Sequence, residues 1–169
     1  MNRFLKGCIC ILIIISSYCC SGSYRTEKDH DQTIYVGKVD RALFEKSDLS
    51  WFKEEYQRYT PQSKVLDSIR HEKDSLDVII FLGTWCGDTQ RELPRFQKII
   101  ETEKIPLRVI EYHALNRNKE SGEALPAEYG IRFVPTFVFL RNGKEIGRIV
   151  ETPRKSLEED IVDIFSAAK

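Results

Sequence analysis

The sequence predicts an α/β protein with a mixed central sheet flanked by helices. Three observations lead to this fold class: a continuous apolar strand at residues 78–82, a helical pattern directly after it, and a strong hairpin signal in the last third of the chain. The order strand, helix, strand, helix, hairpin, helix implies helices on both faces of the sheet. At 169 residues, 41% hydrophobic and 31% charged, the composition is that of one soluble domain.

The part of the chain before the central strand predicts a short strand and two helices. Residues 33–36 are mostly β-branched or aromatic and favour a strand. Large apolar side chains then recur at spacings of three and four, which is the period of a helix face: Leu49, Phe52, Tyr56 and Tyr59. Asp48 or Ser50 is placed to cap this helix. After a break at Pro61, a second helix is expected around residues 65–76.

The middle of the chain begins with the clearest strand. Residues 78–82 are continuously apolar, which is typical of a central strand covered on both faces. A helix follows to about Lys104, and its Thr-Gln-Arg-Glu at residues 89–92 has the form of a capping box. Residues 107–110 predict the next strand. A polar loop and one short helix at residues 124–129 come after it.

The last third predicts a hairpin and a helix. Residues 136–140 and 145–150 flank Asn142-Gly143, a pair that supplies the positive φ angles of a tight hairpin turn. Ser156 then starts a final amphipathic helix that runs to about Ala168.

The first residues indicate export from the cytoplasm. Arg3 and Lys6 precede an apolar run at residues 7–15 that is too short to span a bilayer comfortably. We therefore divide the chain into a signal peptide at residues 1–20, a flexible tether at 21–32 and a single domain at 33–169. Within that domain, residues 33–75 form an N-terminal extension and residues 76–169 form the core.

Cysteine placement sharpens this interpretation. Four of the five cysteines, Cys8, Cys10, Cys19 and Cys20, lie in or beside the signal, and Cys86 alone lies in the body of the chain. Cys19 or Cys20 resembles the lipid-attachment cysteine of bacterial lipoproteins. We expect a periplasmic protein anchored to the membrane by lipid, with ordinary cleavage near residues 21–23 as the alternative. Either route places the domain where thiols tend to be oxidised.

The charge pattern argues against several other classes of function. Basic and acidic residues balance at 26 each, with no basic block of the kind that follows a nucleic-acid backbone. The three histidines, His30, His71 and His113, are scattered, and no second cysteine accompanies Cys86 in the domain, so we expect no metal site and no cofactor. A monomer is the expected state.

Two ordered motifs carry a resemblance to a known family. Trp85-Cys86-Gly87 stands at the predicted strand–helix junction, and Pro94 follows eight residues after the cysteine. Residues 129–137, Tyr-Gly-Ile-Arg-Phe-Val-Pro-Thr-Phe, precede Arg-Asn-Gly-Lys. By these motifs, residues 76–169 resemble the thioredoxin-like family. The resemblance implies a thioredoxin fold and a cis peptide before Pro135, and residues 33–75 resemble the extra elements of secreted members.

The chain departs from the family at two positions. Family oxidoreductases carry Cys-x-x-Cys, whereas residues 86–89 read Cys-Gly-Asp-Thr, so Thr89 replaces the resolving thiol. The buried acid that the family places six residues before the first cysteine corresponds to Ile80. The two losses agree with each other, because the acid serves the thiol that is missing.

The available chemistry is that of a single thiol. A cysteine at the start of a helix is stabilised as the reactive thiolate by free N–H groups and the helix dipole. Attack on a disulfide would give a mixed disulfide, and a thiol from outside the chain would have to release it. The resemblance implies that Trp85 and the backbone of Val134 and Pro135 form the docking surface.

The polar side chains expected near the Cys86 sulfur have more than one possible role. The Thr89 hydroxyl is placed either to donate a hydrogen bond to Cys86 or only to cap the helix. Asp88 opposes a thiolate when it lies close. Glu111 and His113 stand two apart near a strand end, and a solvated strand end is the simpler interpretation, although Glu111 falls where the family has a lysine beside the redox site.

The leading hypothesis is single-thiol exchange by Cys86 with protein or small-molecule disulfides in the cell envelope. The main alternative is a binding or chaperone-like module that keeps the surface around Trp85 and Pro135 without turnover, or a decayed enzyme with a structural role. An inert core cysteine is a further alternative. Peroxidase chemistry has less support because the peroxiredoxin motif is absent, and cluster binding through Cys86 and glutathione would need a glutathione site.

Overall fold

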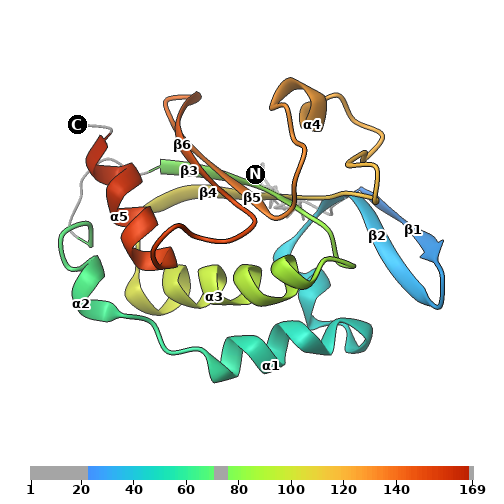
Figure 1. Ribbon diagram of the computed structural model, residues 1–169, viewed down its shortest axis with the longest axis horizontal. Coiled ribbons are helices and arrows are strands. Elements are labelled where there is room, and N and C mark those ends of the chain that lie inside the picture. The colour runs from blue at the N-terminus through green and yellow to red at the C-terminus, as the bar shows by residue number, and fades with distance from the viewer. Residues whose placement is uncertain (1–22, 71–75, 168–169) are drawn as a thin grey trace, which may run out of the picture.

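A computed structural model describes residues 23–70 and 76–167. Its strands form one six-stranded sheet in the order β1-β2-β4-β3-β5-β6 (Figure 1). The predicted signal peptide, including Cys19 and Cys20, lies outside the described residues. The strands are β1 (Tyr24–Asp29), β2 (Gln32–Val39), β3 (Leu76–Leu82), β4 (Leu107–Ala114), β5 (Thr136–Arg141) and β6 (Lys144–Val150). Only β3 and β4 pair in parallel, which confirms the mixed sheet.

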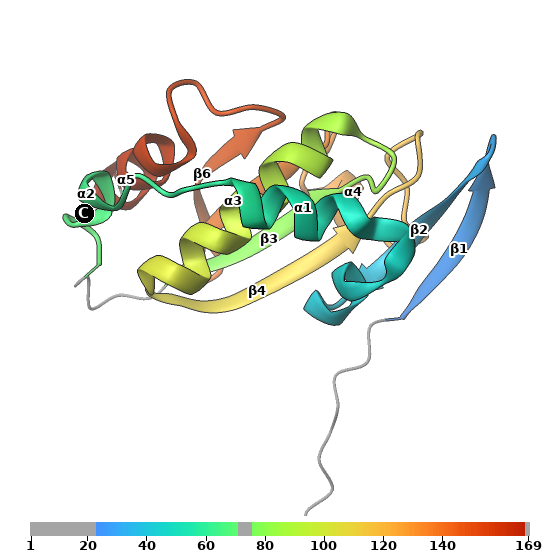
Figure 2. The same ribbon diagram turned by 90° about the horizontal axis from the view of Figure 1, so that it is seen from below.

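The helices lie on both faces of the sheet, as predicted. They are α1 (Ser50–Arg58), α2 (Ser63–Leu66), α3 (Gly87–Glu103), α4 (Leu125–Glu128) and α5 (Leu157–Ala167), with two short 3-10 helices at Arg41–Glu45 and Ser47–Leu49. Figure 1 shows α3 and α5 below the sheet and α4 above it. Helix α1 packs on α3 and forms an outer layer, as the view in Figure 2 shows. No helix in the described ranges has both the length and the apolar character to cross a bilayer.

Two apolar clusters cover the two faces of β3. Val78, Ile80 and Leu82 belong to the larger cluster, which includes the side chains of α3 and α5, while Ile79 and Phe81 belong to the smaller one. This alternation follows from the two-residue period of a strand. All five side chains are buried, so the prediction of a central strand covered on both faces is confirmed.

The N-terminal segment differs from the sequence-based expectation. Residues 24–29, which fall in the expected tether at 21–32, form β1 and pair antiparallel with β2 along their full length. Most β1 side chains are exposed, so the strand carries no apolar alternation that would reveal it in the sequence. Its backbone groups pair with the edge of β2, because unpaired edge groups favour a further strand. The extension at 33–75 also supplies β2 to the sheet.

Two of the three predicted helix caps differ from the structure, those of α1 and α3. Leu49 precedes α1 without a side-chain cap, and Asp48 instead accepts a hydrogen bond of 2.7 Å from the Tyr35 hydroxyl. Helix α3 begins at Gly87, so Thr89 lies inside its first turn and the predicted capping box is wrong. The Ser156 hydroxyl does accept from the Glu159 N–H at 3.1 Å, which confirms the cap of α5.

The C-terminal hairpin forms as predicted. Asn142 and Gly143 have φ angles of 52° and 77°, the positive values that a tight turn of this kind requires. Gly147 on β6 allows α5 to approach, since a Cβ atom there would lie 2.9 Å from Cγ1 of Ile164. The hairpin thereby completes the sheet, and α5 packs against β6.

Candidate functional site

Cys86 lies at the junction between β3 and α3. It is the N-cap of a 17-residue helix, with extended backbone angles of −92° and 125°. Its N–H donates to the Gly83 carbonyl at 2.9 Å, and its own carbonyl accepts from the Gln90 N–H at 3.0 Å. The side chain is half-buried. The sulfur therefore stands at the positive end of a long helix, where free backbone N–H groups collect.

A cis peptide bond faces the sulfur from the other side. The Val134–Pro135 peptide is cis, as the family resemblance implies. The Cys86 thiol donates to the Val134 carbonyl over an Sγ···O distance of 3.1 Å. Trp85 and Cys86 both pack against the smaller apolar cluster, which contains Val134. The structure therefore brings together the two motifs that the sequence predicted to form the site.

The Trp85 indole lies across Gly83. Its Nε1–H donates to the Leu115 carbonyl at 2.9 Å. A Cβ atom at Gly83 would come within 2.7 Å of Cε2 of this ring. Because that distance is far below van der Waals contact, only glycine at position 83 lets the indole adopt this position.

We expect Gly83→Ala to displace the Trp85 indole and to destabilise the protein by about 1–3 kcal/mol, as overpacking does. The indole would lose its bond to Leu115. A Trp51→Phe background leaves Trp85 as the single tryptophan, so its fluorescence spectrum reports the displacement. Gly87→Ala is the matched control, because a Cβ atom there meets nothing within 4 Å. Identical spectra for Gly83→Ala and its parent would contradict this packing.

Thr89 occupies the position of the absent second thiol and is fully buried. Its Oγ1 accepts a hydrogen bond of 3.3 Å from the Gly83 N–H. Within the described parts of the chain, no hydrogen bond joins it to the Cys86 sulfur. Neither predicted role for the hydroxyl is therefore observed, and Thr89 instead fixes the turn that leads from β3 into α3.

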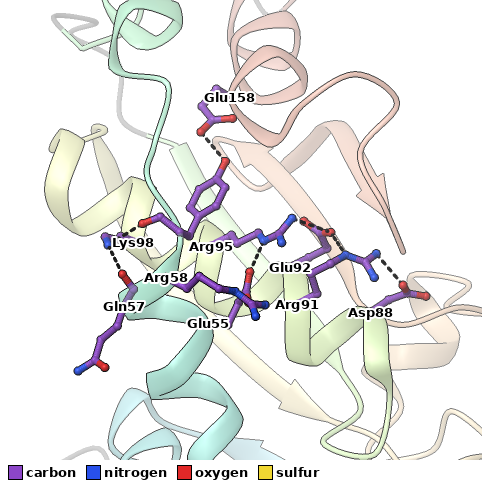
Figure 3. Close-up of polar contacts among 10 residues, drawn as sticks. Glu55, Gln57, Arg58, Asp88, Arg91, Glu92, Arg95, Lys98 and Glu158 are labelled. Atoms are coloured by element: carbon purple, nitrogen blue, oxygen red, sulfur yellow. Dashed lines mark hydrogen bonds and ion pairs between the residues drawn. The ribbon is translucent and has the colours of Figure 1, made fainter.

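Asp88 is tied into a chain of alternating charges between α1 and α3 (Figure 3). Its carboxylate pairs with Arg91 at 2.7 Å. From there the pairs continue through these residues: Arg91 with Glu92, Glu92 with Arg95, Arg95 with Glu55, and Glu55 with Arg58. Arg91 therefore balances the Asp88 charge in the first turn of α3.

Two cations that the sequence analysis did not identify cover Trp85. The guanidinium carbon of Arg117 lies 4.8 Å from the ring centroid, and the Lys119 ammonium lies 5.2 Å from it. Asp29 at the end of β1 accepts a hydrogen bond of 2.7 Å from Nε of Arg117. The only sequence signal was a pair of basic residues in a polar loop, 32 and 34 positions after Trp85.

The surroundings of Glu111 and His113 differ from the predicted solvated strand end. His113 is only 3% exposed, so the predicted solvated strand end is wrong for this side chain. Its Nδ1 lies 3.0 Å from a Glu123 carboxylate oxygen, and its Nε2 lies 3.4 Å from one of Glu111. The loop after β4 brings Glu123 back over the ring, which is why the strand end is covered. In the ranges that the structure describes, no group of three or more ligand-type side chains is placed to hold a metal ion.

Open space adjoins the start of α3. Two hollows of about 260 and 310 Å³ share Trp51 and Gln90. The first reaches Gly87 and the second reaches Thr84, so together they flank the turn that carries Cys86. Strand β2 also contacts this turn, because the Tyr35 N–H donates to the Thr84 hydroxyl at 3.3 Å.

Comparisons with known proteins agree with this geometry. A family model described as thioredoxin matches residues 44–165. A thioredoxin-like protein of Acanthamoeba polyphaga mimivirus is 34% identical over 92 residues, which are 54% of this chain and 64% of the viral protein, just under two thirds of its length. A thioredoxin of Malassezia sympodialis is 33% identical over 91 residues, covering 52% of this chain and 80% of that one.

One solved structure, an HIV epitope-scaffold, has a TM-score of 0.51 at 15% identity. The match covers 70% of this chain and 82% of the scaffold. At that level of identity the likeness bears on the fold alone, and it agrees with the observed sheet and helices.

Proposed function

The chain belongs to the thioredoxin family, and from this premise we propose that Cys86 performs single-thiol exchange with disulfides of proteins or small molecules in the cell envelope. Thiol–disulfide redox chemistry is the activity that the family suggests. The observation that carries the proposal is the position of the sulfur at the N-cap of α3, 3.1 Å from the carbonyl that precedes the cis proline.

The first step is attack by the Cys86 thiolate on one sulfur of a substrate disulfide. A bond forms between Sγ and that sulfur, the substrate S–S bond breaks, and its electron pair leaves with the second sulfur as a thiolate. The proton that Cys86 gives up passes to solvent or to the departing thiolate. The Val134 carbonyl, which accepts from the thiol in the resting protein, becomes free to accept from the substrate backbone.

The second step requires a thiol that the domain does not supply. Cys86 is the free cysteine of the described residues, and Thr89 holds the place of a resolving partner. A thiolate from the substrate, from a small molecule or from another protein would attack the mixed disulfide and return Cys86 to its reduced state. The proposed reaction is thus exchange or isomerisation.

The proposed docking surface joins Trp85 to the loop that carries Val134 and Pro135. Phe133, next in the chain before Val134, is 50% exposed and adds an apolar ring to this surface. An exposed aromatic side chain beside main-chain acceptors is suited to an extended polypeptide, because the backbone contacts are independent of sequence.

We place this chemistry in the periplasm, with a lipid anchor at Cys19 or Cys20. The support for this location is the sequence of the first 20 residues: a basic start, an apolar run and cysteines at its end. Fatty-acid labelling that disappears in Cys19→Ser or Cys20→Ser would support the anchor. A mature protein that begins at residues 21–23 without lipid would point to ordinary cleavage.

Covalent trapping tests the proposed exchange. We expect the wild-type protein in native extract to form mixed disulfides that appear on a non-reducing gel and disappear on reduction. Cys86→Ser, which replaces one atom, is the matched control and should form none. Failure of wild-type Cys86 to react with either extract or an alkylating reagent at neutral pH would contradict the enzymatic proposal.

A binding module without turnover is the second candidate. The exposed Phe133 and the hollows around Trp51 and Gln90 favour it, because these surfaces can hold a partner without a thiol. This candidate predicts that partner capture survives in Cys86→Ser. Loss of capture in that variant would reject it.

A further inference from the structure

A cationic patch, formed by Arg117 and Lys119, lies against the tryptophan next to the candidate nucleophile. Both cations are within 5.2 Å of the Trp85 ring centroid, at distances where an aromatic ring attracts positive charge. The indole is itself fixed by its bond to Leu115 and by its contact with Gly83. The patch therefore has a defined place beside Cys86.

The loop that carries the patch is held by its own hydrogen bonds. The Asn116 side chain accepts from the N–H groups of Asn118 and Glu120, each at 3.0 Å. The Lys119 ammonium donates to the Arg117 carbonyl at 2.8 Å. These bonds limit the freedom of the loop and of the Lys119 side chain, so less entropy is lost when they meet a ligand.

Asp29 orients the arginine from the other side. Nε and Nη2 of Arg117 lie 2.7 and 2.6 Å from the same Asp29 oxygen. The Arg117 side chain is still 50% exposed, so its remaining edge faces solvent. The hydrogen bond from Arg117 lowers the pKa of the Asp29 carboxyl.

The patch presents two cations, and the acids beside it each have a hydrogen-bond partner. Asp29 accepts from Arg117, and Glu120, next to Lys119, accepts from Nδ2 of Asn116 at 3.3 Å. Asp88, two residues after Cys86 in the chain, pairs with Arg91. The hydrogen bond to Asp29 raises the pKa of Arg117, and the charge of a Cys86 thiolate acts in the same direction.

We propose that the Arg117–Lys119 patch makes Cys86 select disulfides that carry a carboxylate close to the reacting sulfur. This inference rests on the proposed function of Cys86. A carboxylate on the attacked half of the disulfide would lie near the exposed edge of Arg117 as the sulfurs come together. The chemistry is shared by small anionic disulfides and by peptide disulfides with acidic neighbours.

Reaction rates with matched small disulfides test the selectivity. We compare dithiobis(nitrobenzoate), whose two halves each carry a carboxylate, with neutral dithiodipyridine. Arg117→Gln should lower the ratio of the two rate constants about 3- to 10-fold, the size expected for removing one partly screened charge a few ångströms away. The ratio should also fall as added salt shortens the Debye length to about 3 Å.

Arg108→Gln is the matched control. Arg108 is also an exposed arginine whose Nε donates to an aspartate, here Asp77 at 2.9 Å, and its loss changes the net charge by the same amount. It lies on β4 and its partner lies at the start of β3, whereas Cys86 follows the end of β3. The ratio should stay at the wild-type value in this variant.

The outcomes separate the two proposals. If Arg117→Gln changes both rate constants by the same factor, the arginine acts on the thiol itself, and the proposed selectivity is overturned. A ratio of rate constants that stays unchanged in Arg117→Gln would also overturn the selectivity. So would a ratio that falls as far in Arg108→Gln as in Arg117→Gln. Failure of the wild-type protein to react with either reagent would instead reject the proposed function of Cys86.

The two sources of carboxylate are then distinguished directly. Glutathione disulfide represents a small-molecule source, and a peptide disulfide with glutamates beside its cysteine represents a protein source. Each is compared with its amidated form. A preference for the acidic form that Arg117→Gln abolishes supports the selectivity and identifies the source, whereas equal rates for both acidic and amidated forms overturn it.

Discussion

Thr89→Cys is expected to form an intramolecular disulfide with Cys86 on mild oxidation. Cys86 is the N-cap of α3, and position 89 is the third residue of that helix. The side chain of an N-cap residue is directed toward the third residue of its helix. In α-helix geometry the Cα atoms of residues three apart lie about 5 Å from each other, within the Cα range of about 4.4–6.8 Å that a disulfide accepts. The variant would recreate the spacing of a dithiol enzyme.

Thiol counting before and after oxidation measures this result in a protein that lacks the first 22 residues, so that no other cysteine interferes. Two titratable thiols should fall to none in Thr89→Cys. Thr89→Ser keeps a hydroxyl at the same position and is the control, with one thiol throughout. Two thiols that persist in the oxidised Thr89→Cys protein would show that the placement of these residues is wrong.

With dithiothreitol present to reduce the disulfide that each cycle leaves between Cys86 and position 89, the same variant should gain turnover in the reduction of a protein disulfide. Its new thiol can attack the mixed disulfide on Cys86 from within the chain, so release no longer depends on an external thiol. Loss of the Thr89 hydrogen bond to Gly83 should cost about 1 kcal/mol. Ile80 leaves the new thiol without an acidic proton acceptor, so we expect the release step to remain slow.

Phe96→Ala is expected to lower the free energy of unfolding by about 3–5 kcal/mol. Phe96 is fully buried on α3, and its ring lies 4.8 Å from that of Phe137 and 6.2 Å from that of Phe139 on β5. Removing it would open a cavity between the helix that follows Cys86 and the strand that follows Pro135. Such a loss is a large part of the roughly 5–15 kcal/mol that stabilises a typical domain.

Urea unfolding measures this effect as a lower midpoint at an unchanged slope. Val109→Ala on β4 is the control, because Val109 is 42% exposed and surface changes typically alter stability by about 0.5 kcal/mol or less. Equal midpoints for the two variants would show that Phe96 does not join α3 to β5 as described.

The core of the fold was predictable because its residues carry local signals. The continuous apolar run of β3, the helical stripe of α3 and the Asn142-Gly143 turn each specify their own structure from neighbouring residues. Strand β1 carries no such signal. Its exposed, mostly charged side chains resemble a tether, and only pairing with β2, which is itself placed by β4, makes it a strand.

The part of the candidate site that lies in the two sequence motifs was predictable. The contacts made by residues outside those motifs were not. Trp85, Cys86 and Val134, which precedes the cis proline, meet as the motifs implied. Arg117 reaches Trp85 through a loop that β1 helps to position, and that contact depends on Asp29, 88 residues away in the chain. The burial of His113 likewise depends on Glu123, which contacts its ring. No local pattern in the sequence indicates that the loop brings Glu123 back over the strand end.

Thr89, enclosed at the base of α3, also determines how long a covalent complex on Cys86 would last. A dithiol enzyme contains its own release step, so its complexes decay at a rate that the protein sets. Here the lifetime would scale inversely with the concentration of thiols in the surroundings. The protein would hold a captured sulfur longest under the most oxidising conditions and let it go as reductant accumulates.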